Sequence, residues 1–189
     1  MVSQINKDFA IESYISNAYS NKGIMVIGYF LIQIKGVSYG VKKDDATALA
    51  CSYDAVIHRL EMRGKHIAPD DLIILPGLEL AQVTNGSLYY RIEKQDSWEF
   101  SIPRDELADT IYKNNLIWAP DGDEAFDDGS RVFQFDIDNE NVRLIGYRTT
   151  DYNIDIHTLS DLKMNSNEFY STLKEWSDGF YKKWQSFNL

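Results

Sequence analysis

The densest cluster of side chains that could do chemistry in this sequence is acidic. Five carboxylates fall within eight residues, a stretch (121–128) that we call the acidic block: Asp121, Asp123, Glu124, Asp127 and Asp128. Charges of one sign at this spacing repel one another unless a positive group lies nearby. The block is therefore expected to be a solvated acidic turn, a calcium site, or a surface that binds a basic protein.

Calcium binding is the weaker of the two functional hypotheses. Asp121 and Asp123 stand at alternate positions, as the oxygen ligands of calcium loops do. The EF-hand pattern then needs another oxygen ligand followed by glycine, but Ala125 and Phe126 stand there. A calcium-dependent binding module thus remains an alternative function, and the sequence does not favour it.

As a protein-binding surface, the block has two aromatic residues close to it in the sequence. Carboxylates would steer and pair with a basic partner, while the aromatic side chains would supply apolar anchors. Electrostatic steering can accelerate association on the order of a hundredfold. The predicted interface has seven members: Trp118, Asp121, Asp123, Glu124, Phe126, Asp127 and Asp128.

Other candidates for catalysis are isolated in the sequence. His58, His66 and His157 show no ligand spacing such as His-Glu-x-x-His, and we interpret them as ordinary surface or helix-end residues. Cys51 is predicted to be a small buried hydrophobe. The sequence contains no phosphate loop, nucleophile elbow or kinase signature. We therefore predict a protein that is not an enzyme and needs no cofactor; a hydrolase that uses a block carboxylate and a histidine is a distant third possibility.

The charge of the chain is concentrated. Its 189 residues carry a formal net charge of -10, and residues 105–140 contribute -9 of it with 11 acidic and 2 basic side chains. Such a field repels DNA, RNA and anionic membranes, so direct nucleic-acid binding is not expected, and a basic protein partner is favoured.

The remaining composition indicates a soluble, cytoplasmic protein of one domain, residues 1–189. A hydrophobic content of 44% is enough to build a core. Cys51 is the only cysteine, so no internal disulfide can form and a reducing compartment is expected. The longest apolar run, Ile24 to Ile34, is about half the roughly 20 residues that a membrane helix needs.

In the first half of the chain, the pattern predicts a hairpin and then a helix. The run Ile24 to Ile34 is rich in β-branched and aromatic residues, and Lys35-Gly36 separates it from the strand-like residues 37–41. After Asp44 and Asp45, which can cap a helix, an amphipathic stripe is expected to end at Gly64. The stripe has helical spacing: Leu49, Tyr53, Val56 and Leu60.

The second half predicts further hairpins and a terminal helix. We expect strands at residues 72–75 and 98–102, a hairpin turn at Asn85-Gly86, a helix over 104–113 and a hairpin formed by 131–137 and 142–147. A helix over residues 166–189 carries an apolar stripe: Phe169, Leu173, Trp176, Phe180 and Trp184. The predicted fold class is α+β: a single domain with a mainly antiparallel sheet built of hairpins, one central helix and a C-terminal helix.

Several stretches resemble a known family. The sequences at 44–47, 63–69 and above all 118–130, together with Phe135-Asp136, are similar to the bacterial immunity protein 42 family, over a region from about Asp8 to Tyr147. The resemblance implies a gene beside that of a polymorphic or contact-dependent growth inhibition toxin. It also implies binding to the C-terminal domain of that toxin, and it transfers no catalytic residue to this chain.

The function that we expect is therefore that of an antitoxin-like inhibitor, which covers the active site of a cognate toxin. Toxins that act on RNA or DNA are commonly basic around their sites, so the charge favours a nuclease as the partner. The identity of the toxin and the stoichiometry of the complex have no signal in the sequence, because such partners recognise one another through surface detail.

Overall fold

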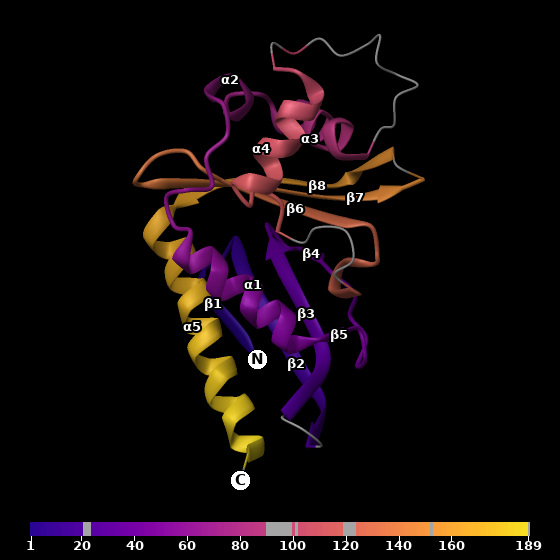
Figure 1. The fold of residues 1–189 in the computed structure, drawn as a ribbon, viewed down its shortest axis with the longest axis vertical. Helices are drawn as coiled ribbons and strands as arrows, with labels where there is room; N and C mark the ends of the chain where they lie inside the picture. Colours follow the sequence, from indigo (N-terminus) through magenta and orange to yellow (C-terminus); the bar gives the residue numbers. More distant parts are fainter. Residues whose placement is uncertain (21–23, 90–99, 101, 119–123, 152, 189) are drawn as a thin grey trace.

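A computed structural model describes residues 1–189 except 21–23, 90–99, 101, 119–123, 152 and 189. Two antiparallel sheets and their covering helices make up the described chain (Figure 1). In chain order the elements are β1 (Val2–Asn6), β2 (Phe9–Ser20), β3 (Ile24–Ile34), β4 (Val37–Tyr39), β5 (Thr47–Ala48), α1 (Leu49–Glu61), α2 (Asp70–Ile73), α3 (Gly77–Tyr89), α4 (Arg104–Lys113), η2 (Glu124–Phe126), β6 (Ser130–Asp136), β7 (Asn141–Thr150), β8 (Asn153–Asn165), α5 (Ser166–Gln185) and η3 (Ser186–Asn188).

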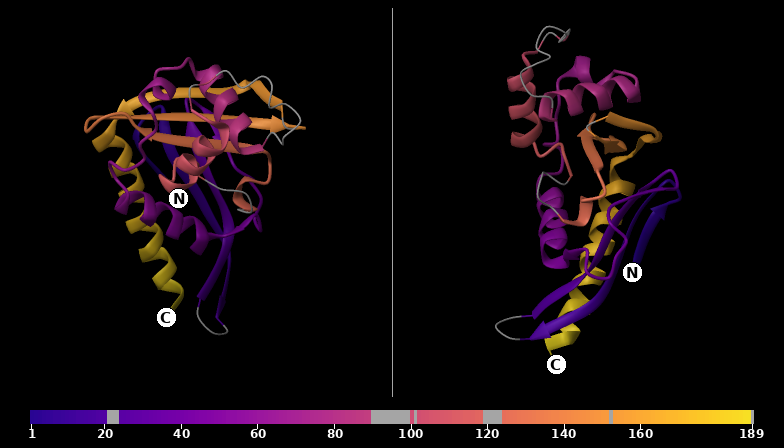
Figure 2. Two further views of the ribbon diagram at one scale, coloured as in Figure 1. Left: turned by 45° about the horizontal axis from the view of Figure 1, so that its top comes forward. Right: turned by 90° about the vertical axis from the view of Figure 1, so that its right-hand side faces the viewer.

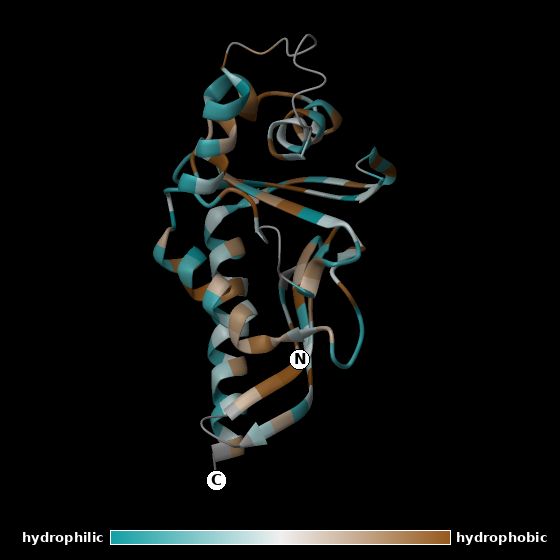
Figure 3. Cartoon of the chain, turned by 45° about the vertical axis from the view of Figure 1, so that its right-hand side comes forward, coloured by the Kyte–Doolittle hydropathy of each residue, from teal (hydrophilic) through white to brown (hydrophobic). Residues whose placement is uncertain are grey.

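The two sheets have different orders and different covers. The first sheet has the order β1-β2-β3-β4, with β5 paired to β3, and the second has the order β6-β7-β8. Helices α1 and α5 run along the first sheet, whereas α2, α3 and α4 lie on the far side of the second (Figures 1 and 2). The helices carry both hydrophobic and hydrophilic residues (Figure 3), as expected where one side of a helix covers a sheet.

The second sheet separates two apolar cores. Alternate residues of β6 and β7 point to opposite faces. Val132, Val142 and Leu144 join the core formed with the first sheet, α1 and α5. Phe133 and Ile145 join the core beneath α2, α3 and α4. This burial on both faces explains why β6 and β7 carry apolar residues at adjacent positions, such as Val132 and Phe133 or Leu144 and Ile145.

The β2–β3 hairpin extends beyond the end of β1 as an arm, which we define as residues 14–20 and 24–29. The short strand β5 pairs with the arm at Ile27 and Gly28. Its register shifts between Ile15 and Asn17, so Ser16 is the extra residue of a β-bulge. Gly28 lies opposite the bulge, where a Cβ atom would come 1.7 Å from the Tyr14 carbonyl oxygen. Only glycine fits this position, and the bulge therefore fixes the register of the arm.

Most of the predicted elements are confirmed. The α+β class holds, as do the hairpin of β3 and β4, the helix α4, the hairpin of β6 and β7, and the C-terminal helix α5. Helix α1 is also present, but Asp44 and Asp45 do not cap it, since its N-cap is Ala48 with no side-chain hydrogen bond. Among the described residues, no helix combines the length and the apolar character needed to cross a membrane.

The prediction of strands and a hairpin around Asn85-Gly86 is wrong. Residues 77–89 form α3, and Asn85 is buried inside it. The predicted strand at 72–75 is largely the short helix α2. The turn preference of Asn-Gly was overridden by packing, because Leu80 and Ala81 are fully buried against the second sheet. The predicted strand at 98–102 lies mostly outside the described residues.

Candidate functional site

The acidic block is fastened to the core at its N-terminal side by Trp118. This side chain is only 3% exposed, and its ring contacts Phe169 edge-on, with the centroids 6.1 Å apart. The Arg59 guanidinium lies over the indole, 4.4 Å from the ring centroid. Arg59 also donates hydrogen bonds to the carbonyl oxygens of Asn115 and Ile117, so it holds the segment that leads into the block.

The C-terminal side is fastened by Phe126, which is 4% exposed and contacts Phe30 with a centroid distance of 6.3 Å. The adjacent Ala125 is fully buried, and its carbonyl oxygen accepts a 2.8 Å hydrogen bond from the amide of Val41. We call Trp118 and Phe126 the roots of the block. Both are core side chains, so they do not form the exposed apolar anchors that the sequence predicts.

The described carboxylates of the block divide into free and paired groups. Glu124 and Asp127 are exposed. Asp128 is exposed too, but its Oδ2 accepts a 3.0 Å hydrogen bond from Nε of Arg148, and its Oδ1 accepts one from the amide of Ser130. Asp121 and Asp123 lie outside the described residues, so their place in an interface and the calcium hypothesis both remain predictions.

The described acids of the segment 105–140 do not form one continuous patch. The exposed acids of α4 (Asp105, Glu106 and Asp109) lie above the second sheet, while η2 lies below it (Figure 1). Asp138 and Glu140 are exposed in the β6–β7 turn, at the opposite end of the sheet from η2. Among the described residues, a charge that is concentrated in the sequence is thus spread over three parts of the surface.

Behind the roots lies a buried polar network that the sequence pattern did not predict. Asp136 accepts hydrogen bonds from the Tyr170 hydroxyl and from the amides of Gly64 and His66. The Gln134 side-chain amide donates to Asp136 and Tyr170, and its oxygen accepts from Arg59. The network therefore ties α1, the segment after it, β6 and α5 together at the junction of the two sheets.

Burial controls the protonation of this network. It lowers the pKa of Arg59 to about 9 and lowers the pKa of His66, to which the Arg59 charge also contributes. Burial and the neighbouring Asp136 raise the pKa of Tyr170 well above its ordinary value. Both oxygens of Asp136 are occupied by donors, and Tyr170 holds its proton, so the arrangement suits a structural role rather than acid–base catalysis.

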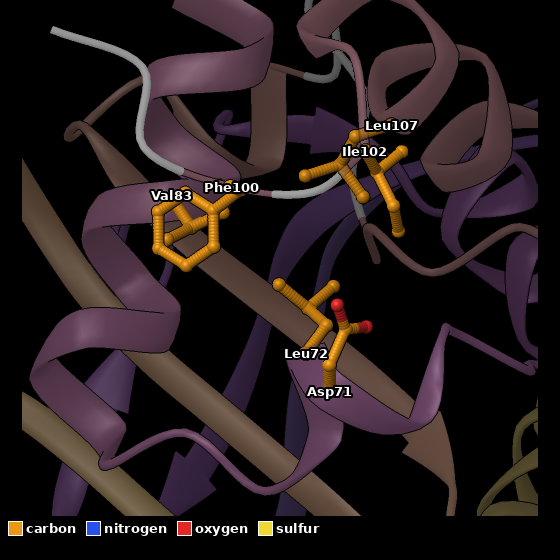
Figure 4. Close-up of a pocket in the computed structure, with 6 residues that line it drawn as sticks. All are labelled: Asp71, Leu72, Val83, Phe100, Ile102 and Leu107. Carbon is orange, nitrogen blue, oxygen red and sulfur yellow. The ribbon is translucent and has the colours of Figure 1, made fainter.

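Two pockets border these regions, and neither has the character of a substrate site. An apolar pocket lies among α2, α3, α4 and the segment before α4 (Figure 4), with a volume of about 10 Å³, room for one water molecule at most. Its lining residues are Asp71, Leu72, Val83, Phe100, Ile102 and Leu107. A polar pocket of about 240 Å³ lies beside Asp136 and the start of α5. It contains no histidine or cysteine, and its central carboxylate is already paired.

The predicted surface positions of the histidines are confirmed in part, and the predicted burial of the cysteine is not. His58 and His157 are exposed, as expected. His66 is fully buried, with Nδ1 3.0 Å from the carbonyl oxygen of Asn115. The prediction that Cys51 is buried is wrong, since it lies on the exposed side of α1. No group of three or more His, Cys, Asp or Glu residues suited to a metal ion occurs in the part of the chain that the structure describes.

The comparison with protein families gives a match over most of the chain. The model of immunity protein 42 matches residues 6–179. The match extends beyond Tyr147, where the sequence resemblance ends, and includes β8 and most of α5. No curated protein and no solved structure matches the chain.

Proposed function

Because the chain belongs to the immunity protein 42 family, we propose that it neutralises a cognate bacterial toxin by binding the C-terminal domain of that toxin and covering its active site. An immunity function follows from the family, and the way in which it is achieved is our proposal. The observation that supports it best is the construction of the acidic block, in which buried roots hold exposed carboxylates in place.

The physical logic combines steering with preorganisation. Glu124 and Asp127 are exposed and close to a rigid base, so ordering them on binding costs little conformational entropy. Exposed carboxylates attract a basic partner over a Debye length of about 8 Å at physiological salt. A toxin that acts on RNA or DNA has a basic track for phosphates, and the block would occupy that track. The partner is therefore proposed to be a basic nuclease domain.

The experiment compares two charge-neutralised variants. The first carries Asp121→Asn, Asp123→Asn, Glu124→Gln and Asp127→Asn, and it leaves the Asp128 ion pair intact. The matched control carries Asp105→Asn, Glu106→Gln and Asp109→Asn on α4, away from the block. Association with the toxin domain encoded beside the gene is then measured by stopped flow at low and high salt.

We expect the block variant to associate at least tenfold more slowly at low salt, with a smaller difference at high salt because salt screens exposed charges. The α4 variant should stay close to wild type. Equal slowing of the two variants would show that only net charge matters, and unchanged rates in both would place the interface elsewhere. Either result would overturn the proposed role of the block.

A further inference from the structure

Strand β8 contains a large bulge near its N-terminal end. Between the pairs Gly146–Ser160 and Arg148–Asp155, one residue of β7 stands opposite four residues of β8, 156–159. A regular antiparallel ladder would place a single residue there. The bulge therefore adds three residues to β8, at the end of the second sheet where the acidic block leads into β6.

The bulge removes Ile156 from the core in which a regular strand would place it. Alternate residues of a strand share a face, so a regular β8 would put Ile156 on the face of Ile154. Ile154 packs against the core beneath α2, α3 and α4, and so does Leu159. Ile156 is instead 60% exposed, so the free chain loses the burial of a large aliphatic side chain here. Bulges often redirect a side chain in this way beside functional sites.

Hydrogen bonds hold the bulge in this shape. The Thr158 hydroxyl donates to the carbonyl oxygen of Asp155 at 2.7 Å and accepts from the amide of Arg148 at 2.9 Å. The carbonyl oxygen of Thr158 in turn accepts a 2.6 Å hydrogen bond from the Tyr39 hydroxyl. Because the backbone on either side of Ile156 is fixed, little conformational entropy is lost when this side chain enters a complex.

The bulge is connected to the acidic block through Arg148. The backbone amide of Arg148 bonds to Thr158 in the bulge, and its side chain forms the ion pair with Asp128 at the end of the block. Helix η2, which carries the described start of the block, lies at the same end of the second sheet as the β7–β8 turn (Figure 1). The exposed Ile156 is therefore continuous with the surface that we propose for toxin binding.

The charge around the bulge indicates the chemistry of a partner. The segments 124–131 and 148–157 meet where Ser130 pairs with Arg148, and together they contain five acidic and two basic side chains. Binding hot spots combine an apolar anchor with a surrounding rim that excludes water. A rim rich in carboxylates is complementary to basic side chains, which the proposed toxin domain would present around its active site.

We propose that Ile156 is an apolar anchor of the toxin interface and inserts into an apolar depression of the toxin domain that is bordered by basic side chains. This role rests on the proposed function, and it replaces the role that Trp118 and Phe126, as core side chains, do not fill. An anchor acts after the partners have met, so it should control the rate of dissociation, whereas the carboxylates control the rate of association.

The experiment measures dissociation of the complex with the toxin domain encoded beside the gene. A labelled variant in the complex is displaced by an excess of unlabelled wild-type chain and followed by stopped flow. Ile156→Ala should dissociate about tenfold faster than wild type and associate within about twofold of its rate. The matched control is Ile74→Ala, the same change at a residue that is 79% exposed at the C-cap of α2. It should match wild type in both rates.

Thermal melts should show both variants to be as stable as wild type, since both residues are exposed. Should Ile156→Ala fail to fold, Ile156→Thr serves instead, because it keeps the β-branched shape that suits a strand. A wild type that binds the toxin while the Ile156 variant dissociates at the same rate overturns the anchor and leaves the proposed function standing. Equal acceleration by Ile156→Ala and Ile74→Ala does the same. A wild type that does not bind the toxin overturns the proposed function, and the anchor with it.

Discussion

The acidic block and the arm are two surface regions of this molecule that are built in opposite ways. The block has buried aromatic roots and exposed carboxylates. The arm has exposed tyrosines and no charged residue from 13 to 21. Charge acts at long range and is weakened by salt, whereas the packing of exposed aromatic side chains acts only on contact. One chain thus presents two surfaces that should respond differently to mutation and to ionic strength.

The largest expected difference is in stability. Trp118→Ala should lower the free energy of unfolding by about 3–5 kcal/mol, because it removes a large core side chain. Tyr14→Ala, in the arm, should cost at most about 1 kcal/mol, since Tyr14 is half exposed. Urea unfolding followed by circular dichroism measures both. A stable Trp118→Ala protein would show that the block is not fastened through this root.

A second comparison concerns the rigidity of the arm. Gly28→Ala should cost about 2 kcal/mol, because its Cβ would collide with the Tyr14 carbonyl group. Gly36→Ala is the control: Gly36 also disfavours alanine, with φ of +81°, but no atom lies within 4 Å of the added Cβ. It should cost about 1 kcal/mol. Equal losses in urea unfolding would mean that the bulge adapts and does not fix the register.

The network behind the roots predicts a pH dependence. The pKa of His66 is lowered in the folded protein, so the unfolded chain takes up a proton first as the pH falls through 6.5. Stability should therefore fall with pH from about 6.5 until the pH drops below the pKa of folded His66. His66→Gln should show a smaller fall over this window in urea titrations. An identical pH profile in the variant would contradict the assignment.

The smallest effect is expected from the ion pair at the end of the block. Asp128→Asn should cost about 0.5 kcal/mol, because the Arg148 pair is partly exposed and screened by solvent. Glu124→Gln should leave the melting temperature unchanged, since Glu124 is exposed. Calorimetry distinguishes the two variants. A loss of several kcal/mol on Asp128→Asn would mean that this acid belongs with the roots rather than with the exposed carboxylates.

The sequence predicted the elements that local patterns specify and missed those that depend on packing. The hairpins at β3 and β6 and the helix α5 follow from their own periodicity. The buried stripe of α1 is Leu49, Ser52, Val56 and Arg59, whereas the predicted stripe contained Tyr53 and Leu60. A buried arginine cannot be inferred from apolar spacing, although its place three residues after Val56 on this face was a usable signal.

In the candidate site, too, the sequence predicts what is local and misses what depends on packing. The acidic composition of residues 121–128 is explicit in the sequence, and Glu124 and Asp127 are exposed as such a block requires. Whether an aromatic residue beside a charged loop contacts a partner or the core depends on distant segments. Phe30 and Phe169, the ring partners of the two roots, lie 96 and 51 residues away in the chain. No local pattern could have placed them.

The separation of roots from carboxylates also has a consequence for evolution. Replacing Glu124 or Asp127 should change little in folding, because both side chains are exposed. Replacing Trp118 or Phe126 removes core packing, so selection for foldability alone should keep them aromatic. Under the proposed role of the block, recognition can then change toward a new toxin through a series of neutral intermediates while the scaffold stays constant. A lineage that must follow a diversifying adversary benefits from keeping its specificity and its stability on different residues.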